Sequence, residues 1–366
     1  MPRIRSAENN GLPTRWRQVH GAYYYQVPAG LEPAWDGKKL FRLGKTLPEA
    51  YKTWADRIGH LEVAQNIGQL LDRYALQVVP TKAVTTQTHN LICIPRLRKV
   101  FGDMPLTAIK PRHIYLYIDK RSAKSTDPET GRVSGGRTIA MREVEVLSHA
   151  LTKAVEWGYI DRHPFKDEVR LEGTAPRNRY VEDWEVIACL ALDSRRKKGS
   201  VRAIQAYVRI KLMTGMGRGD LLRLKPAEHF REDGIHIQRH KTANSSGKRT
   251  IYEWTPELRA ATQEAIAARP ALSPFLFCKR DGHGYFDETT GEAHGWDSMW
   301  QRFMERVMAE TDVKEKFTEH DLRAKCGSDA TSLEHARALL SHADSKTTNA
   351  IYRRKPEVVK PLNGVG

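Results

Sequence analysis

The chain has 366 residues, 40% of them hydrophobic, and this length predicts two or three domains with ordinary cores. Lysine and arginine number 60 against 44 aspartates and glutamates, and the net charge of +16 favours a polyanionic partner, with nucleic acid ahead of an acidic membrane surface. Because there is no signal-peptide core, no apolar run of roughly 18 residues and no C-x-x-C spacing among the 4 cysteines, we expect no membrane anchor, no disulfide framework and no zinc site.

Residues 1–60 predict a small β-rich module. Ala22–Val27 and Lys39–Leu43 are the expected strands, and both stop at turn-forming proline or glycine residues. Thr46 is the expected cap of a following helix. The tyrosine run at 23–25 has basic neighbours, and two interpretations stay open: the sheet lies against DNA, or the tyrosines pack against the module's own helix.

Residues 62–172 predict a helical domain. Helices are expected before Pro80, over 85–101, after Pro111 and over 138–157. The last of these is the longest, because its apolar residues recur at intervals of three and four. A loop rich in serine, glycine and proline is expected at 122–136.

Residues 173–180 predict a short basic linker, followed by a mixed but mostly helical domain at 181–355 and a tail at 356–366. Gly234–Gln238 and Arg249–Trp254 alternate apolar and polar residues around a turn, which predicts a β-hairpin. Helices are expected at 182–197, 201–215, 256–268, 296–311, 319–328, 332–341 and 346–353.

An ordered row of polar residues near the C-terminal end can act on a phosphodiester: His320, Arg323, His342 and Tyr352. Thr318 and Asp321 form a capping pattern, so His320 and Arg323 project from the first turn of a helix, where the dipole favours an anion. Arginine can hold a phosphate with two hydrogen bonds, histidine can move its proton, and tyrosine can attack it. Taken singly, each residue type has a structural interpretation as a core, capping or surface side chain.

Two other segments can also meet a phosphate. The hairpin turn carries Lys241, which can protonate a leaving oxygen, with Lys248 as the competing candidate and a solvent-exposed turn lysine as the alternative. The glycine-rich run 214–219 offers backbone N–H groups and Arg218, or is simply a connection between helices. It lacks a P-loop lysine pattern, so ATP is not indicated.

In this order and spacing, these residues resemble the tyrosine recombinase family, in particular the phage and prophage integrases. The matching stretches are Thr214-Gly215-Met216 with Arg218 (first-arginine box), Lys241-Thr242 (hairpin lysine), His320–Arg323 (H-x-x-R box), Leu340–His342 (last histidine) and Tyr352 (nucleophile). Leu147–Phe165 is similar to the last helix of the family's core-binding domain, and residues 1–60 are similar in layout to an arm-type DNA-binding module.

The chain departs from the family pattern at three points. Gly217 occupies the position of the catalytic arginine, and arginine follows one residue later at Arg218. Either Arg218 supplies the guanidinium or the clamp is impaired, because glycine cannot replace arginine at an anion site. Ser341 stands where a glycine is usual, which we expect to be mild, and the interval from His342 to Tyr352 is one residue longer than usual.

The resemblance implies a multidomain, mainly α fold, with a β-rich N-terminal module, a helical core-binding domain of SAM-like type and an α+β catalytic domain containing the hairpin. It implies that Tyr352 forms a 3′-phosphotyrosine while Arg218, Arg323, His320 and His342 bind and protonate the phosphate and Lys241 protonates the leaving oxygen. Further contacts to the DNA backbone are expected from Arg177, Arg179, Lys248, Arg353 and Arg354. No metal or other cofactor is expected.

The implied partners are double-stranded DNA with attachment sites and further copies of the chain, four in all on DNA. A DNA-bending host factor and an excisionase are further expected partners, and the implied role is integration or excision of a phage or mobile element in the bacterial cytoplasm. The Val-Val and Leu residues of the 356–366 tail suggest docking on a neighbouring copy.

Three other functions compete with this one. A type IB topoisomerase uses similar chemistry as a monomer, but the separate N-terminal module argues against it. A catalytically impaired DNA-binding relative, with Gly217 as the lesion, predicts specific binding without covalent adducts. A basic RNA-binding protein is disfavoured because no RNA-module motif is present.

Overall fold

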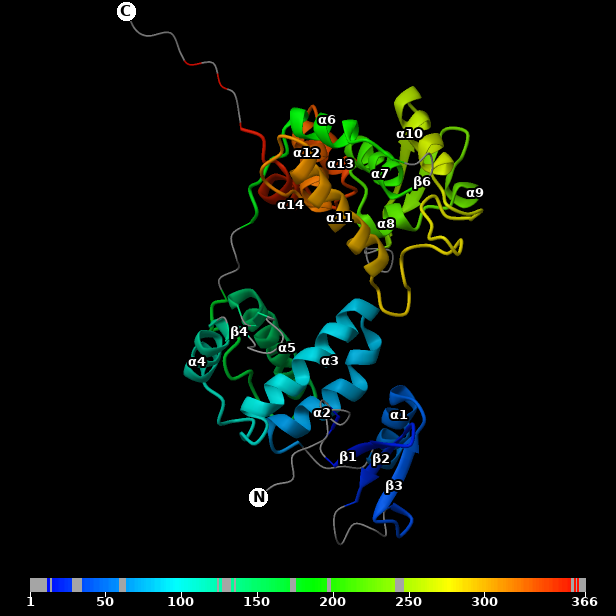
Figure 1. Ribbon diagram of the computed structural model, residues 1–366. Helices are drawn as coiled ribbons and strands as arrows, with labels where there is room; N and C mark the ends of the chain where they lie inside the picture. The colour runs from blue at the N-terminus through cyan, green and yellow to red at the C-terminus, as the bar shows by residue number, and fades with distance from the viewer. Residues whose placement is uncertain are drawn as a thin grey trace, which may run out of the picture. The chain divides into compact units, whose positions relative to one another are not determined.

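The computed structural model describes residues 12–13, 15–27, 35–58, 64–123, 125–126, 133–134, 136–171, 176–195, 199–240, 247–356, 359 and 361 (Figure 1). The chain divides into two compact units, Met1–Thr174 and Ala175–Gly366. The expected mainly α class is confirmed, with small antiparallel sheets beside the helices. In the described part of the chain, no helix has the length and apolar character to cross a membrane.

The first unit begins with a three-stranded antiparallel sheet, β1 (Trp16–Val19), β2 (Ala22–Gln26) and β3 (Leu40–Gly44), followed by helix α1 (Leu47–Ile58). The expected strands at 22–27 and 39–43 are confirmed, whereas β1 was not expected because it has only 4 residues. Trp16 is buried, and the Tyr25 ring lies 4.6 Å from that of Trp35. Tyr25 therefore packs inside its own module.

The rest of the first unit is a helical bundle made of α2 (Ile67–Gln77), the short 3-10 helix η3 (Val79–Thr81), α3 (Val84–Phe101), α4 (Pro111–Ser122) and α5 (Arg137–Glu156). These bounds confirm the four expected helices. The expected loop at 122–136 also contains two short paired strands, β4 (Ser125–Thr126) and β5 (Val133–Ser134). Helix α5 buries Glu143, which accepts hydrogen bonds from Arg96, Arg121 and Tyr117. The burial of this carboxylate is thus compensated.

The second unit contains α6 (Asp183–Ala191), α7 (Ser200–Thr214), α8 (Arg218–Leu222), α9 (Pro226–His229), β6 (Gly234–Gln238), β7 (Arg249–Glu253), α10 (Pro256–Ala267), α11 (His294–Glu310), α12 (Glu319–Asp329), α13 (Leu333–Leu339), α14 (Ser345–Thr347) and the π-helical segment η5 (Thr348–Tyr352). Helix α7 packs against α10, α11 and α12 and is the centre of the unit. Its Tyr207 ring lies 4.7 Å from that of Trp296, and both side chains are buried.

Two sequence predictions in this unit are confirmed in detail and two differ. The hairpin pairs Gly234 with Glu253 through Gln238 with Arg249. Thr255 caps α10 and is followed by proline at the first helical position. The helix expected at 182–197 is shorter and stops at Ala191, because the buried Leu192 leaves the helical conformation and Gln205 Nε2 donates to the Leu190 and Leu192 carbonyls at the helix end. In place of the helix expected at 346–353 there are the short α14 and the π-helical η5.

Candidate active site

The turn between α7 and α8 is the first component of the site. Gly215 ends α7 with a φ of +60°, and a Cβ there would stand 2.8 Å from Leu340 Cδ2, so both the backbone and the space require glycine. Below the turn, the buried Lys211 donates from Nζ to the Met216 carbonyl at 3.1 Å. Burial lowers the pKa of Lys211 to about 8. Lys211 and Arg323 therefore stabilise the turn by donating to the carbonyls of Met216 and Gly215.

Arg323, on the first turn of α12, is the buried cation of the site. Its Nη1 donates to the Gly215 carbonyl, and its Nη2 donates to the Leu340 carbonyl at 2.6 Å and lies 3.2 Å from His342 Nε2. Its guanidinium carbon lies 5.4 Å from the centre of the Tyr352 ring. No ion pair joins Arg323 to a carboxylate within the described ranges. A buried guanidinium held by carbonyl groups keeps its positive charge available to an anion.

His342 is buried, and its two ring nitrogens have different partners. Nδ1 lies 2.8 Å from the hydroxyl of Thr348, and Nε2 faces the donor Arg323. Because Arg323 can only donate, the consistent tautomer carries its proton on Nδ1 and leaves Nε2 as an acceptor. Burial lowers the pKa of His342 to about 4, and the cations Arg323, Arg239 and Lys248 act in the same direction. The imidazole is therefore neutral at pH 7.

The hairpin fixes the segment that carries His342. Lys248 Nζ donates to the His342 carbonyl at 2.8 Å, and the Tyr252 hydroxyl donates to the Leu339 carbonyl at 2.9 Å. Ser341 has a φ of +51°, which is the left-handed region that favours the glycine usual at this position. Its hydroxyl lies 2.6 Å from that of Thr250, and this hydrogen bond offsets part of the backbone strain.

Tyr352 ends the π-helical segment η5 and is 8% exposed. Its ring centre lies 5.1 Å from that of His320 and 4.9 Å from that of His342. The Ser328 hydroxyl donates to the Tyr352 carbonyl at 2.8 Å. A π-helical turn holds one residue more than an α-helical turn, so it absorbs the extra residue between His342 and Tyr352 and still delivers the tyrosine to the histidines.

The capped start of α12 was expected and is confirmed. Thr318 accepts from the backbone N–H of Asp321, and Asp321 accepts from that of Thr318 at 2.8 Å. His320 projects from this turn and is partly open to solvent. Desolvation by the surrounding protein lowers its pKa, and the charges of Arg354 and Arg323 act in the same direction. A neutral imidazole beside the tyrosine is able to accept its proton.

Arg218 points elsewhere. Its Nη1 lies 2.7 Å from Asp297 Oδ1, and its Nε lies 3.6 Å from Glu319 Oε2. The structure therefore places Arg218 in a carboxylate cluster, while it groups Tyr352, Arg323 and the two histidines together. Lys241 lies outside the described residues.

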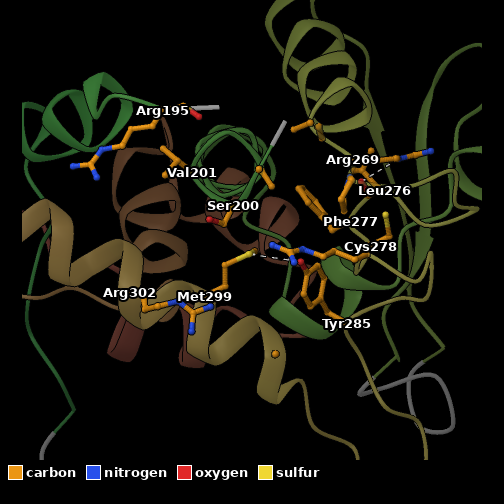
Figure 2. A pocket seen from close by; sticks show the side chains of 18 of the residues that line it. Arg195, Ser200, Val201, Arg269, Leu276, Phe277, Cys278, Tyr285, Met299 and Arg302 are labelled. Carbon is orange, nitrogen blue, oxygen red and sulfur yellow. Dashed lines mark hydrogen bonds between the residues drawn. The ribbon is translucent and has the colours of Figure 1, made fainter. Parts of the chain in front are cut away.

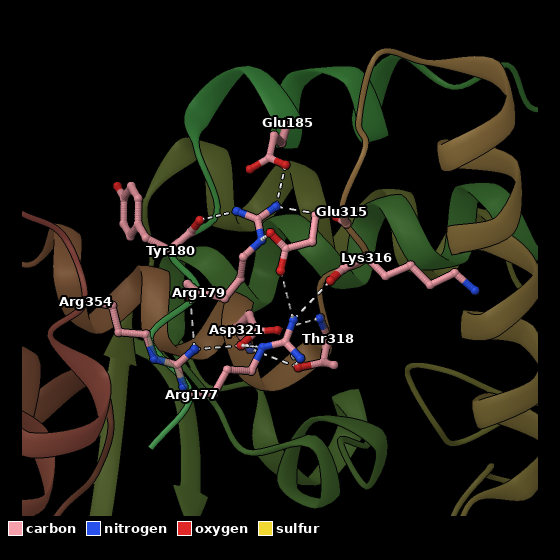
Figure 3. Close-up of polar contacts among 9 residues, drawn as sticks. All are labelled: Arg177, Arg179, Tyr180, Glu185, Glu315, Lys316, Thr318, Asp321 and Arg354. Carbon is pink, nitrogen blue, oxygen red and sulfur yellow. Dashed lines mark hydrogen bonds and ion pairs between the residues drawn. The ribbon is translucent and has the colours of Figure 1, made fainter. Parts of the chain in front are cut away.

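Three of the arginines expected on DNA take part in an internal ion-pair network (Figure 3). Asp321 is fully buried and accepts from Arg354 Nη1 at 2.6 Å, with Arg177 Nε at 3.2 Å. Arg179 pairs with Glu185 at 2.5 Å and Glu315 at 3.2 Å. These contacts tie the start of the unit and the residues after Tyr352 to α12. Contact of Arg177, Arg179 and Arg354 with DNA remains a prediction, as it does for the exposed Arg353.

Sequence reasoning missed Thr348 and Arg239. Nothing in the sequence marks Thr348, whose role depends on a contact with His342. Arg239 has a signal, because residues 235, 237 and 239 share one face of an alternating strand. Desolvation lowers the pKa of this half-buried arginine, and the charge of Arg323 lowers it further, while Asp220 and Tyr352 raise it. Arg239 is thus electrostatically part of the site.

The second unit also contains a pocket lined by other residues. Its volume is about 480 Å³, and it lies between α7, α10 and α11, with Ser200, Phe277, Tyr285 and Met299 among its lining residues (Figure 2). None of the expected site residues lines it. Among the described residues, no group of three or more histidines, cysteines and carboxylates is placed to hold a metal ion.

No family model matches the chain, and no curated protein matches it. Solved structures do. A lambda integrase dimer bound to a COC′ core site matches with a TM-score of 0.59 at 17% identity, over 98% of this chain and 99% of that chain. A lambda integrase tetramer bound to a Holliday junction gives 0.56 at 16% identity, over 92% and 97%. The Tn1549 transposon integrase in complex with circular intermediate DNA gives 0.58 at 15%, over 79% and 95%.

These structural neighbours are tyrosine recombinases, and they match most of this chain. The resemblance seen in the sequence is confirmed at the level of the fold. At this low identity, the assignment of chemistry depends on the side chains themselves.

Proposed function

We propose that the chain is a site-specific DNA recombinase of the tyrosine type, with Tyr352 as its nucleophile. The observation that carries this proposal is the convergence of Tyr352 with two histidines and a buried arginine. The His320 and His342 rings lie 5.1 and 4.9 Å from the tyrosine ring, and the Arg323 guanidinium lies 5.4 Å from it. A nucleophile, proton carriers and an anion clamp are what phosphodiester transfer needs.

The chemistry follows from these groups. The Tyr352 oxygen forms a bond to phosphorus while the bond to the 5′-oxygen breaks, which leaves a 3′-phosphotyrosine and a free 5′-hydroxyl. Neutral His320 accepts the tyrosine proton, Arg323 binds the non-bridging oxygens, and Lys241 gives a proton to the leaving oxygen. His342 positions the Arg323 guanidinium through its acceptor Nε2. A 5′-hydroxyl from a partner strand then attacks the phosphotyrosine and reverses these steps. The phosphotyrosine conserves the energy of the broken bond, so the proposed cycle uses no metal and no nucleotide.

The partners follow from the charge and from the neighbours. A net charge of +16 favours duplex DNA. The solved lambda integrase structures are a dimer on a core site and a tetramer on a Holliday junction. We therefore propose four copies on attachment sites of a phage or other mobile element in a bacterial cytoplasm, assisted by a bending factor and an excisionase.

The same reasoning assigns the domains. Residues 1–60 bind arm-type DNA, 62–172 form the core-binding domain, 173–180 the linker and 181–355 the catalytic domain. The 356–366 tail docks on a neighbouring copy, and unchanged assembly after its deletion would exclude that role. Most of this tail lies outside the described residues.

A second candidate function is that of an impaired relative that binds specific DNA without cutting it. The observation that favours it is the engagement of Arg218 by Asp297 and Glu319, beside a glycine at position 217. If no other cation serves the phosphate, the transition state loses stabilisation of about 3–4 kcal/mol.

A covalent trap tests both candidates. Wild type and Tyr352→Phe are expressed in cells that carry the source DNA, the cells are lysed in detergent, and protein-linked DNA is recovered and sequenced. Adducts at discrete sites with wild type alone support the recombinase. Specific binding without adducts supports the impaired relative. Adducts without sequence preference, together with relaxation by a monomer, would indicate a type IB topoisomerase.

A further inference from the structure

Arg239 directly follows strand β6 and lies on its inward face. Ile235 and Ile237 are buried while Gln238 is exposed, so the two-residue period places Arg239 with the isoleucines. The hairpin that carries it is fastened to the His342 segment, because Lys248 donates to the His342 carbonyl at 2.8 Å. Arg239 is therefore held on a supported strand end.

Among the described residues, Arg239 and Arg323 form no ion pair with a carboxylate, although the charge of Asp220 acts on Arg239 and raises its pKa. Arg239 interacts electrostatically with Arg323, His342 and Lys248, since each pair affects the pKa of one of its members. Assembling like charges in a half-buried place costs free energy. A bound phosphate would offset that cost, so the cluster has the character of an anion site.

Asp220 lies beside both Gly217 and the backbone segment that carries Arg239. A Cβ on Gly217 would stand 2.8 Å from Asp220 Oδ2, and the backbone N–H of His240 donates to Asp220 Oδ1 at 2.9 Å. Gly217 has an ordinary φ of −61°, so its backbone accepts any side chain. Position 217 and the strand end that carries Arg239 therefore both adjoin Asp220, whose charge raises the pKa of Arg239.

From this geometry we propose that Arg239 is a catalytic residue that clamps the scissile phosphate together with Arg323. It supplies, from the end of β6, the guanidinium that the chain lacks at Gly217. This inference rests on the proposed recombinase function and deepens it. The reaction steps are unchanged, and Arg239 stabilises the charge that develops on the non-bridging oxygens.

The test uses the full chain and a nicked duplex oligonucleotide that carries the cleavage site recovered with wild type. Arg239→Ala is expected to slow adduct formation by about 10²–10³-fold, the usual effect of losing one such donor. Arg249→Ala is the matched control, because Arg249 is an exposed arginine opposite Gln238 on the neighbouring strand, and its rate stays close to that of wild type. Adding Gly217→Arg to Arg239→Ala is expected to restore part of the lost rate.

A second substrate separates charge stabilisation from a structural role. A methylphosphonate at the scissile position removes one negative charge, so Arg239→Ala and wild type are expected to cleave it at similar rates. Equal loss on both substrates would mean a structural role and would overturn the proposal. An unimpaired Arg239→Ala on the ordinary phosphodiester would also overturn it and leave the recombinase function standing. A wild type that forms no adduct would overturn both.

Discussion

Replacing Asp321 with asparagine should destabilise the second unit far more than removing an exposed ion pair of the same length. Asp321 and Arg354 approach to 2.6 Å, with side-chain exposures of 0% and 4%. Glu334 and Arg337 also approach to 2.6 Å, but their exposures are 66% and 30%. Breaking a buried pair strands a charge and costs about 3–5 kcal/mol, whereas an exposed pair contributes about 0–1 kcal/mol.

We therefore expect Asp321→Asn to lower the free energy of unfolding by about 3 kcal/mol, because asparagine keeps the shape and part of the hydrogen bonding. Urea unfolding of the full chain measures this, with Glu334→Gln as the control. Adding Arg354→Met to Asp321→Asn removes the stranded cation and should recover more than half of the loss. Equal losses for Asp321→Asn and Glu334→Gln would show that burial does not increase the contribution of the Asp321–Arg354 pair to the free energy of unfolding, and would refute the reasoning.

Three other perturbations give sharp expectations. The pKa of His342 is about 4 in the folded chain and about 6.5 in the unfolded chain, so between these pH values only the unfolded chain binds the proton, and stability falls as the pH falls. Urea unfolding at several pH values should show a loss of up to about 3 kcal/mol. His342→Gln should reduce this dependence on pH. Thr348→Val removes the hydroxyl 2.8 Å from His342 Nδ1, which should lower the free energy of unfolding by about 1–3 kcal/mol and slow cleavage. Thr348→Ser keeps the hydroxyl and should keep both the stability and the cleavage rate. A normal cleavage rate for the valine variant would contradict the assigned tautomer. Gly215→Ala meets a φ of +60°, which strains any L side chain, so thermal unfolding should show a loss above about 1 kcal/mol. Gly217→Ala has an ordinary φ of −61° and meets only the Asp220 carboxylate at 2.8 Å, the end of a flexible side chain, so its loss should be smaller.

Much of the site could be predicted because its signals are local in sequence. Thr318 and Asp321 are three residues apart, and a capping box needs no other part of the chain. The hairpin follows from two alternating strands and the turn between them. His320, Arg323, His342 and Tyr352 could also be found from local signals, since each lies in or beside a short helical segment in the last quarter of the chain.

The directions of long side chains could not be predicted. Arg218 lies next to the glycine turn in sequence, yet its partners Asp297 and Glu319 come from the distant helices α11 and α12. Arg354 follows Tyr352 by two residues, but its guanidinium is buried against Asp321. Sequence spacing gives the position of a residue on its element, whereas an arginine reaches several ångströms further and its partner is set by tertiary packing.

Some arginines of this unit have a carboxylate within ion-pair distance and others do not. This difference cannot be seen in the composition. Arg177, Arg179 and Arg354 each have a carboxylate within 4 Å, in Asp321, Glu185 or Glu315, so their charge is already compensated. Arg239 and Arg323 form no ion pair with a carboxylate among the residues whose placement is described, although Arg323 is buried. A buried cation without a carboxylate partner costs free energy, and a bound anion can offset that cost. Arg269 also forms no ion pair among the described residues, but its guanidinium donates to the carbonyls of Ser273 and Leu276, and it lines the pocket that excludes the expected site residues. We therefore propose Arg239 and Arg323 as the phosphate-binding arginines, whereas Arg218, adjacent to the family position in sequence, is compensated by Asp297 and Glu319.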